Sequence, residues 1–223
     1  MLILVAHGTR SAAGLETIGE IADRVSARVG PLRTAFVDVL GPDPAEVLGG
    51  ATETAIIVPA FLASGYHVHT DLPARIAESG HVDTRVTRPL GPDPVLAAVM
   101  HERLVEAGWR AGDAVLMAAA GSSDPRARRD VYRAAEMLGQ HVGEVDVGFL
   151  ATGAPRVRDV VRLLRSHGRR RVFVAPYLLA PGLFHDRLAG CGAAAVAAPL
   201  GAHPGVVDAI AGRFACLGAH ATR

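Results

Sequence analysis

Residues 59–65 read PAFLASG, and a closely similar stretch, PYLLAPG, occupies residues 176–182, which lie 117 positions later. Near the start of the chain, residues 2–10 read LILVAHGTR and align with VLMAAAGSS at residues 115–123, at an offset of 113 positions. Extra loop residues in the second copy account for the difference between the two offsets. A repeat of this length is typical of a duplicated domain and not of a solenoid unit. The sequence therefore predicts two similar halves.

Apolar runs of strand length alternate with amphipathic helical stretches through both halves. The runs are LILVA, TAFVDVL, TAIIVPAF, AVLMAAA, VDVGFLA and RVFVAPYLL. Nearly continuous apolar strands are expected where helices cover both faces of a parallel sheet. The alternation favours α/β layers with right-handed crossovers. We predict two duplicated half-domains with flavodoxin-like layers, each a parallel sheet flanked by helices, at residues 1–110 and 111–223, with the seam near residues 108–112.

The composition argues against several classes of protein. The 223-residue chain is half apolar and carries a formal net charge of +1, so its overall charge gives no reason to expect a nucleic-acid or membrane partner. No apolar run reaches the ~18 residues that span a bilayer, and no basic region precedes the first apolar run as in a signal peptide. Its two cysteines, Cys191 and Cys216, lack a paired metal-ligand spacing. We expect a reduced, cytoplasmic protein in which any anion meets arginine or backbone amides, because no lysine is present.

Ionisable residues stand at the ends of three predicted strands of the first half. His7 follows LILVA, Asp38 ends AFVD, and His67 lies just past the third strand. Because the carboxyl ends of parallel strands meet at one sheet edge, we expect these three side chains to converge there. Two imidazoles and a carboxylate can bind a divalent iron, cobalt or zinc ion. A neutral imidazole can equally serve as a general base.

The second half serves as an internal control for these three residues. The matching positions hold Ala120, Ala151 and Phe184. Residues needed for packing should recur in both halves, so the loss of the ionisable groups favours a single site in the first half. Each group also has a structural alternative, such as a histidine bonded to backbone or Asp38 in a turn before GPDP. Asp71 is expected to be structural, since TDLPARI reads as a helix start.

Two neighbouring motifs extend the candidate site. Gly8 and Thr9 are expected to open the helix that follows His7, where amides and Arg10 would suit an anionic group. The string HVHTDL at residues 67–72 resembles the HxHxDH zinc motif of metallo-β-lactamase-like hydrolases, with leucine in place of the last histidine. A zinc hydrolase that uses HVHTD is therefore one alternative, although that family folds as a β-sandwich.

Three features together resemble the CbiX/SirB-type class II chelatases, in their two-domain form. These are AHGTR after the first strand, a carboxylate at the end of the second, and the pattern P-x-F-L-x-x-G-x-H-V-x-x-D-L-P. The resemblance covers essentially the whole chain. It implies an enzyme that inserts Co²⁺ or Fe²⁺ into sirohydrochlorin or a related tetrapyrrole of siroheme or cobalamin biosynthesis. The metal is then a substrate, and no organic cofactor is expected.

The resemblance also implies roles for individual residues. His7 and His67 match the family's catalytic, metal-binding histidines, and Asp38 stands where many members have glutamate as a metal ligand. The expected substrate-binding residues are Gly8, Thr9, Arg10, His69 and Arg75. The halves would mimic a dimer of shorter relatives, which predicts a monomer. A non-catalytic tetrapyrrole or metal carrier with the same fold is the main alternative, and the choice between iron and cobalt stays open.

Overall fold

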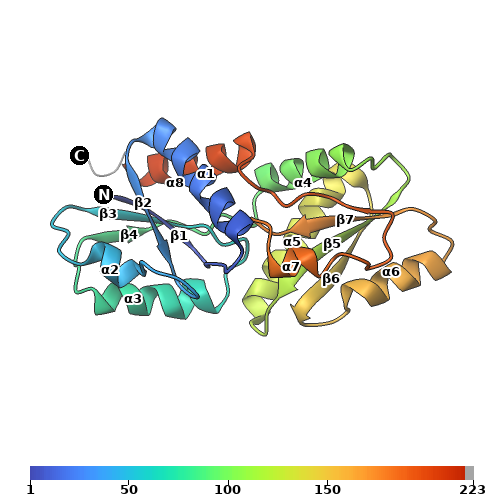
Figure 1. The fold of residues 1–223 in the computed structure, drawn as a ribbon, viewed down its shortest axis with the longest axis horizontal. Coiled ribbons are helices and arrows are strands. Elements are labelled where there is room, and N and C mark those ends of the chain that lie inside the picture. Colours follow the sequence, from blue (N-terminus) through green and yellow to red (C-terminus); the bar gives the residue numbers. More distant parts are fainter. Residues whose placement is uncertain (219–223) are drawn as a thin grey trace.

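The computed structural model describes residues 1–218 and contains two four-stranded parallel sheets (Figure 1). The first sheet has the order β2-β1-β3-β4 and consists of β1 (Leu2–Ala6), β2 (Leu32–Phe36), β3 (Ala55–Pro59) and β4 (Thr84–Val86). The second has the order β6-β5-β7-β8 and consists of β5 (Ala114–Gly121), β6 (Val145–Thr152), β7 (Val172–Tyr177) and β8 (Ala195–Val196). The identical strand order confirms the predicted duplicated α/β fold.

The apolar runs predict the six longer strands, and burial explains why. All residues of β3 and β7 are buried, as expected for strands between neighbours on both sides and helices on both faces. The two strands without an apolar run, β4 and β8, are edge strands of three and two residues. Such short edge strands carry too little sequence pattern to be predicted.

Helices cover both sheets, and α1, α2, α4 and α5 begin at acidic or hydroxyl caps. They are α1 (Ala12–Val29), α2 (Pro44–Leu48), the π-helical turn η1 (His67–Asp71), α3 (Leu72–Glu78), α4 (Pro94–Glu106), α5 (Pro125–Val142), α6 (Val157–Ser166), α7 (Leu183–Asp186) and α8 (Pro204–Gly218). The side chains of Ser11, Asp43, Asp93 and Asp124 accept hydrogen bonds from first-turn amides of α1, α2, α4 and α5. None of helices α1 to α8 within residues 1–218 is long and apolar enough to cross a membrane.

The last helix of each half packs on the other half (Figure 1). Helix α4 lies against α5 and β7, whereas α8 lies against α1 and β3. A buried ion pair links the two exchanged helices, α4 and α8. Arg213 Nη2 of α8 lies 2.7 Å from Asp93 Oδ2 at the start of α4. One apolar cluster consequently runs from Leu4 through Met117 to Phe214. The predicted seam falls in the loop after α4, but α4 and α8 each pack on the opposite half.

Equivalent hydrogen bonds support the predicted pairing of the two halves. The Phe36 N–H donates to the Pro42 carbonyl at 2.9 Å, and the Phe149 N–H donates to the Pro155 carbonyl at the same distance. Both pairs lie 113 positions apart. The loops after β2 and β6 therefore have the same local structure.

The carbonyl that lies next to the shared glycine belongs to Asp38 in the first half and to Thr152 in the second. Gly8 and Gly121 both have φ near +90°, and a Cβ on them would lie 2.1 Å from the Asp38 carbonyl oxygen and 1.8 Å from that of Thr152. Thr152 is one residue past the predicted match Ala151, because the β5–β6 register shifts at a bulge before Gly121. Threonine, like alanine, lacks a carboxylate.

The fold contradicts the zinc-hydrolase alternative. Its sheets are parallel and alternate with helices, whereas that hydrolase family requires a β-sandwich. The stretch HVHTD forms the helical turn η1. Side chains two residues apart on a helix do not face each other, so His67 and His69 are not paired as the zinc motif would require.

Candidate functional site

His7 lies at the carboxyl end of β1, where its loop is tied to the end of β2. The Asp38 N–H donates to the His7 carbonyl at 3.1 Å. The imidazole is exposed, and its Nδ1 lies 3.3 Å from the Gly8 carbonyl oxygen. Because a carbonyl only accepts, Nδ1 of the neutral ring carries the hydrogen, and Nε2 retains its lone pair.

His67 begins η1, just after the loop that follows β3. Its Nδ1 lies 2.9 Å from Asp71 Oδ2, and its ring stacks on Phe61 with the centroids 6.0 Å apart. The side chain is one-third exposed. An ionised carboxylate only accepts hydrogen bonds, so Nδ1 again carries the hydrogen, and in the neutral ring the lone pair is on Nε2.

The two imidazoles meet at the shared strand-end edge. The ring centroids of His7 and His67 are 4.6 Å apart, and the ring planes are inclined at 83°. Each ring has its Nδ1 occupied by an oxygen acceptor, an arrangement common among histidines that bind metals through Nε2. The pair can therefore offer two neutral nitrogen donors to a borderline divalent cation, or accept protons.

Asp38 lies at the same edge, but its carboxylate bonds to its own loop. Oδ1 accepts a hydrogen bond from the Val39 N–H at 2.8 Å, and the side chain is exposed. Within residues 1–218, no group of three or more His, Cys, Asp and Glu side chains is gathered to hold a metal. The structure thus brings His7 and His67 together without Asp38.

The predicted substrate-binding residues occupy different surroundings. Gly8 and Thr9 lie in the loop before α1, which begins only at Ala12, and Thr9 Oγ1 accepts the Ser11 N–H at 3.1 Å. Arg10 is exposed in that loop. The prediction that Gly8 and Thr9 open the helix is therefore wrong by three residues, because Ser11 is the cap.

His69 is exposed and lies near the second half. Hydrogen bonds from Arg126 lower the pKa of Asp124 below its usual range, and the charge of His69 contributes a smaller effect in the same direction. This places His69 near the start of α5.

Asp71, which the sequence predicts to have only a structural role at a helix start, is a further candidate for a functional role. It makes no side-chain capping bond at the start of α3. Its Oδ2 instead faces His67, and its Oδ1 lies 3.8 Å from Arg75 Nε. Arg75 also pairs with Asp43 at 3.5 Å and Glu78 at 3.3 Å. The i, i+4 spacing of His67 and Asp71 was the available signal.

The second half fixes the loop that carries His67. The Ser64 N–H donates to Asp130 Oδ2 of α5 at 2.8 Å, and the Ser64 hydroxyl donates to the same oxygen. The Tyr177 hydroxyl donates to the Leu62 carbonyl at 2.7 Å. Burial raises the pKa of Tyr177 far above its ordinary value, so this donor keeps its hydrogen.

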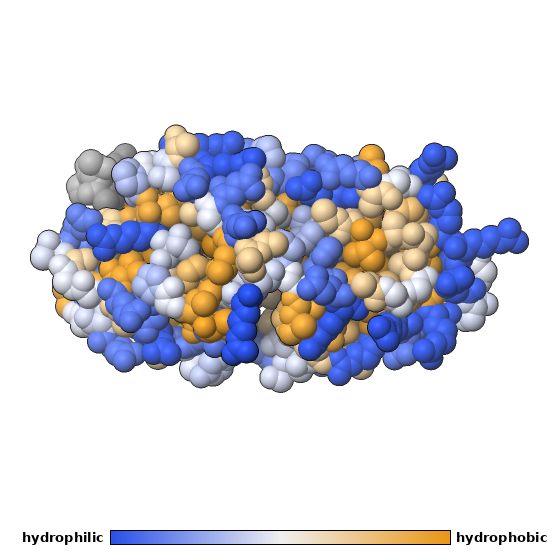
Figure 2. All heavy atoms as spheres, viewed as in Figure 1, coloured by the Kyte–Doolittle hydropathy of each residue, from blue (hydrophilic) through white to orange (hydrophobic). Residues whose placement is uncertain are grey.

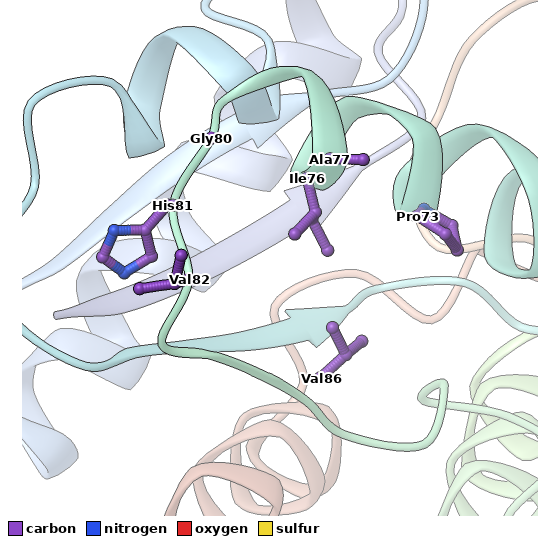
Figure 3. A pocket seen from close by; sticks show the side chains of 7 residues that line it. All are labelled: Pro73, Ile76, Ala77, Gly80, His81, Val82 and Val86. Atoms are coloured by element: carbon purple, nitrogen blue, oxygen red, sulfur yellow. The ribbon is translucent and has the colours of Figure 1, made fainter.

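A hollow of about 430 Å³ lies elsewhere, between α3 and β4 (Figure 3). Its lining residues are Pro73, Ile76, Ala77, Gly80, His81, Val82 and Val86. The lining is mainly apolar, and His81 Nδ1 bonds to the Ala51 carbonyl at 3.1 Å. The histidine pair is not part of this hollow. We therefore place the chemistry at the strand ends.

Two exposed apolar side chains lie in segments next to the candidate site. Tyr66 is 61% exposed, and its ring centroid lies 5.8 Å from that of His67. Leu183, which is 64% exposed, follows Gly182, where a Cβ would lie 3.3 Å from Thr9 Oγ1. Figure 2 shows apolar side chains on one face of both halves. Such side chains suit a flat, largely apolar ligand.

The chain is similar to known proteins over most of its length. The CbiX family model matches residues 1–107 and 114–216. A sirohydrochlorin ferrochelatase from Priestia megaterium is 27% identical over 202 residues, which cover 84% of this chain and 76% of the relative. A sirohydrochlorin cobaltochelatase from the same organism is also 27% identical, over 205 residues that cover 84% and 66%. The solved structure of SirB from Bacillus subtilis with Fe³⁺ aligns with a TM-score of 0.81 and 25% identity, over 99% of this chain and 96% of that one.

Proposed function

This chain belongs to the CbiX family, and on that premise we propose that it inserts a divalent metal ion, Co²⁺ or Fe²⁺, into sirohydrochlorin. The observation that carries the proposal is the His7–His67 pair, with ring centroids 4.6 Å apart. The metal is a substrate, and the reaction needs no organic cofactor.

The reaction requires a metal donor and a proton acceptor at the same place. A free tetrapyrrole loses two pyrrole protons as the cation enters the ring. The Nε2 atoms of His7 and His67 can hold a cation, and two neutral ligands bind it weakly enough to release it. A vacated imidazole nitrogen can then accept a pyrrole proton, so the same residues serve both tasks.

Asp38 is proposed as a third metal ligand. Aspartate is one methylene shorter than the glutamate of many family members. Its carboxylate would have to leave the Val39 N–H, which it now contacts at 2.8 Å. A longer distance between the carboxylate and the metal would weaken this bond. A weaker bond favours release of the metal to the tetrapyrrole over its retention by the protein.

The substrate's carboxylates would meet arginine and backbone amides. Arg10 is exposed beside His7 and suits this role. We propose that Gly8, Thr9 and His69 also contact the substrate, with His69 on the side of the second half. Arg75 pairs with three carboxylates of its own protein, so we assign it a different role below.

We propose that residues 1–110 carry the site and that residues 111–223, whose last five lie outside the described residues, provide a scaffold without it. Phe184 occupies the position that matches His67, and Ala120 that of His7. The exchanged helices support a monomer whose halves stand in for two subunits. A cytoplasmic location without nucleic-acid or membrane partners stays a prediction of the sequence.

The choice between iron and cobalt is not resolved by similarity. The ferrochelatase and the cobaltochelatase of Priestia megaterium are both 27% identical to this chain. Imidazole nitrogen binds either ion. We therefore propose that supply, rather than the site, selects the metal.

Anaerobic insertion into sirohydrochlorin, followed by its absorption spectrum, tests the proposal. We expect acceleration over a protein-free control with Co²⁺ or Fe²⁺. His7→Ala and His67→Ala should each slow insertion by about 100-fold or more. His141→Ala, which removes an exposed histidine of α5, should match the parent. Binding of tetrapyrrole or metal by the folded parent without acceleration would instead identify a carrier.

A further inference from the structure

We propose that Asp71 is a positioning residue that makes His67 a metal donor through Nε2 alone. The proposal rests on the chelatase function above and assigns a role to a residue that contacts neither substrate. Asp71 lies one helical turn after His67. It acts by occupying Nδ1, so that the lone pair of the neutral ring is fixed on the other nitrogen.

The contact between the two side chains is short and well shielded. Nδ1 of His67 lies 2.9 Å from Oδ2 of Asp71, whose side chain is only 18% exposed. A carboxylate offers no hydrogen, so the bond forms only when Nδ1 carries one. In water, imidazole exchanges between two tautomers. Here the carboxylate selects the one with Nε2 unprotonated.

A second contact holds the carboxylate itself. Arg75 Nε lies 3.8 Å from Asp71 Oδ1, the oxygen that does not face His67. Arg75 Nη1 lies 3.5 Å from Asp43 Oδ2. Asp43 is fixed in turn, because it forms a capping box with Glu46 at the start of α2. A continuous series of charged groups therefore links α2, through α3, to the imidazole.

The backbone at this place is specialised for the contact. Residues 67–71 form a π-helical turn, and the Leu72 N–H donates to the His67 carbonyl. Single π-helical turns inside helices occur frequently at functional sites. His7 has no such carboxylate partner, since its Nδ1 faces the Gly8 carbonyl at 3.3 Å. The two histidines are thus supported unequally, and His67 is the more firmly oriented one.

The test compares Asp71→Asn with the parent protein. Asparagine has the same shape but can donate to Nδ1 as well as accept from it, so it no longer selects a tautomer. Glu20→Gln is the matched control, because it removes an exposed carboxylate of an i, i+4 ion pair with Arg24 on α1. Arg75→Gln provides a second variant, which keeps Asp71 but releases its other oxygen.

Two measurements need no tetrapyrrole. Nitrogen-15 NMR of histidine-labelled protein reports which ring nitrogen carries the hydrogen, with the His67 signals identified by their loss in His67→Ala. Calorimetric titration with Co²⁺ gives the affinity of the apoprotein. A third measurement separates kcat from KM for sirohydrochlorin in the insertion assay.

We expect Asp71→Asn to populate both tautomers of His67, to leave His7 unchanged, and to weaken Co²⁺ binding or kcat roughly 10- to 100-fold. KM for sirohydrochlorin should stay the same, and Arg75→Gln should show a smaller change. A folded Asp71→Asn variant with the parent's tautomer and a Co²⁺ affinity within about twofold of the parent's would overturn the proposal. If the tautomer and Co²⁺ affinity change although the parent inserts no metal, the chelatase function fails while the positioning role stands.

Discussion

The carboxylate of Asp130 in the second half accepts two hydrogen bonds from Ser64 of the first half, one from its backbone N–H and one from its hydroxyl. Ser64 stands three residues before His67, in the loop that leads to η1. A side chain of the second half therefore holds the loop that leads to His67. If the site lies in the first half, as we propose, this contact gives the second half a part in positioning it.

Replacing Asp130 by alanine should lower both activity and stability. The Ser64 N–H and hydroxyl would lose their acceptor, which costs about 1–3 kcal/mol in the free energy of unfolding. The insertion rate should fall as the His67 loop loses its support. Urea unfolding and the insertion assay measure the two effects. Asp159→Ala, which removes an exposed carboxylate on α6, should change neither, and equal behaviour of the two variants would refute the prediction.

Tyr177→Phe should destabilise the protein by about 1 kcal/mol at pH 7, because the Leu62 carbonyl loses its donor. Burial holds the pKa of Tyr177 above its ordinary value. Above about pH 10 the unfolded chain ionises this tyrosine and the folded chain does not, so the parent loses stability as the pH rises. The variant lacks this loss.

Urea unfolding of parent and variant at pH 7 and near pH 11 measures how the stability difference between them changes with pH. Between pH 7 and pH 11 the parent should lose about 1.4 kcal/mol of stability relative to Tyr177→Phe, which closes the gap of about 1 kcal/mol and leaves the variant slightly the more stable. Tyr132→Phe, at a side chain that is 41% exposed, serves as the control for the loss of a tyrosine hydroxyl. A gap for Tyr177→Phe that widens would contradict the prediction.

Gly8→Ala should disrupt the site. Gly8 has φ +90°, and a Cβ there would lie 2.1 Å from the Asp38 carbonyl oxygen. The backbone strain alone costs about 1–3 kcal/mol, and the clash would force the ends of β1 and β2 apart. Gly19→Ala in α1, where nothing lies within 4 Å of a Cβ, should instead stabilise the protein by roughly 0.5–1 kcal/mol. Chemical unfolding of both variants gives the comparison.

Tyr66→Ser and Leu183→Ser should raise KM for sirohydrochlorin, by up to about tenfold each, because apolar area would no longer be buried against the macrocycle. The affinity for Co²⁺ alone should stay unchanged, since neither side chain supplies a metal ligand. Val82→Ser tests whether any exposed apolar residue has this effect. It is 97% exposed and lies by the hollow between α3 and β4, and its kinetics should equal the parent's.

The local sequence pattern was sufficient to predict much of the fold and the pair of histidines at the centre of the candidate site. Buried parallel strands must be apolar along their whole length, so the repeat of PAFLASG as PYLLAPG is visible without coordinates. Strands in one parallel sheet end at one edge, and that rule alone predicted that His7 and His67 would meet. Their centroid distance of 4.6 Å confirms this expectation.

Side-chain direction and long-range packing could not be obtained in the same way. An amphipathic stretch shows that a helix has an apolar face but not which sheet covers it, so the exchange of α4 and α8 was invisible. The strand-end rule places Asp38 at the edge but does not fix its rotamer, which turns toward Val39. By residue type, Asp71 and Arg75 fit the start of a helix. Only the contacts of Asp71 with His67 and of Arg75 with Asp43 point instead to a role in positioning the imidazole. Hydrophobic periodicity is a property of the local chain, whereas these contacts depend on how elements that are distant in the sequence pack against each other.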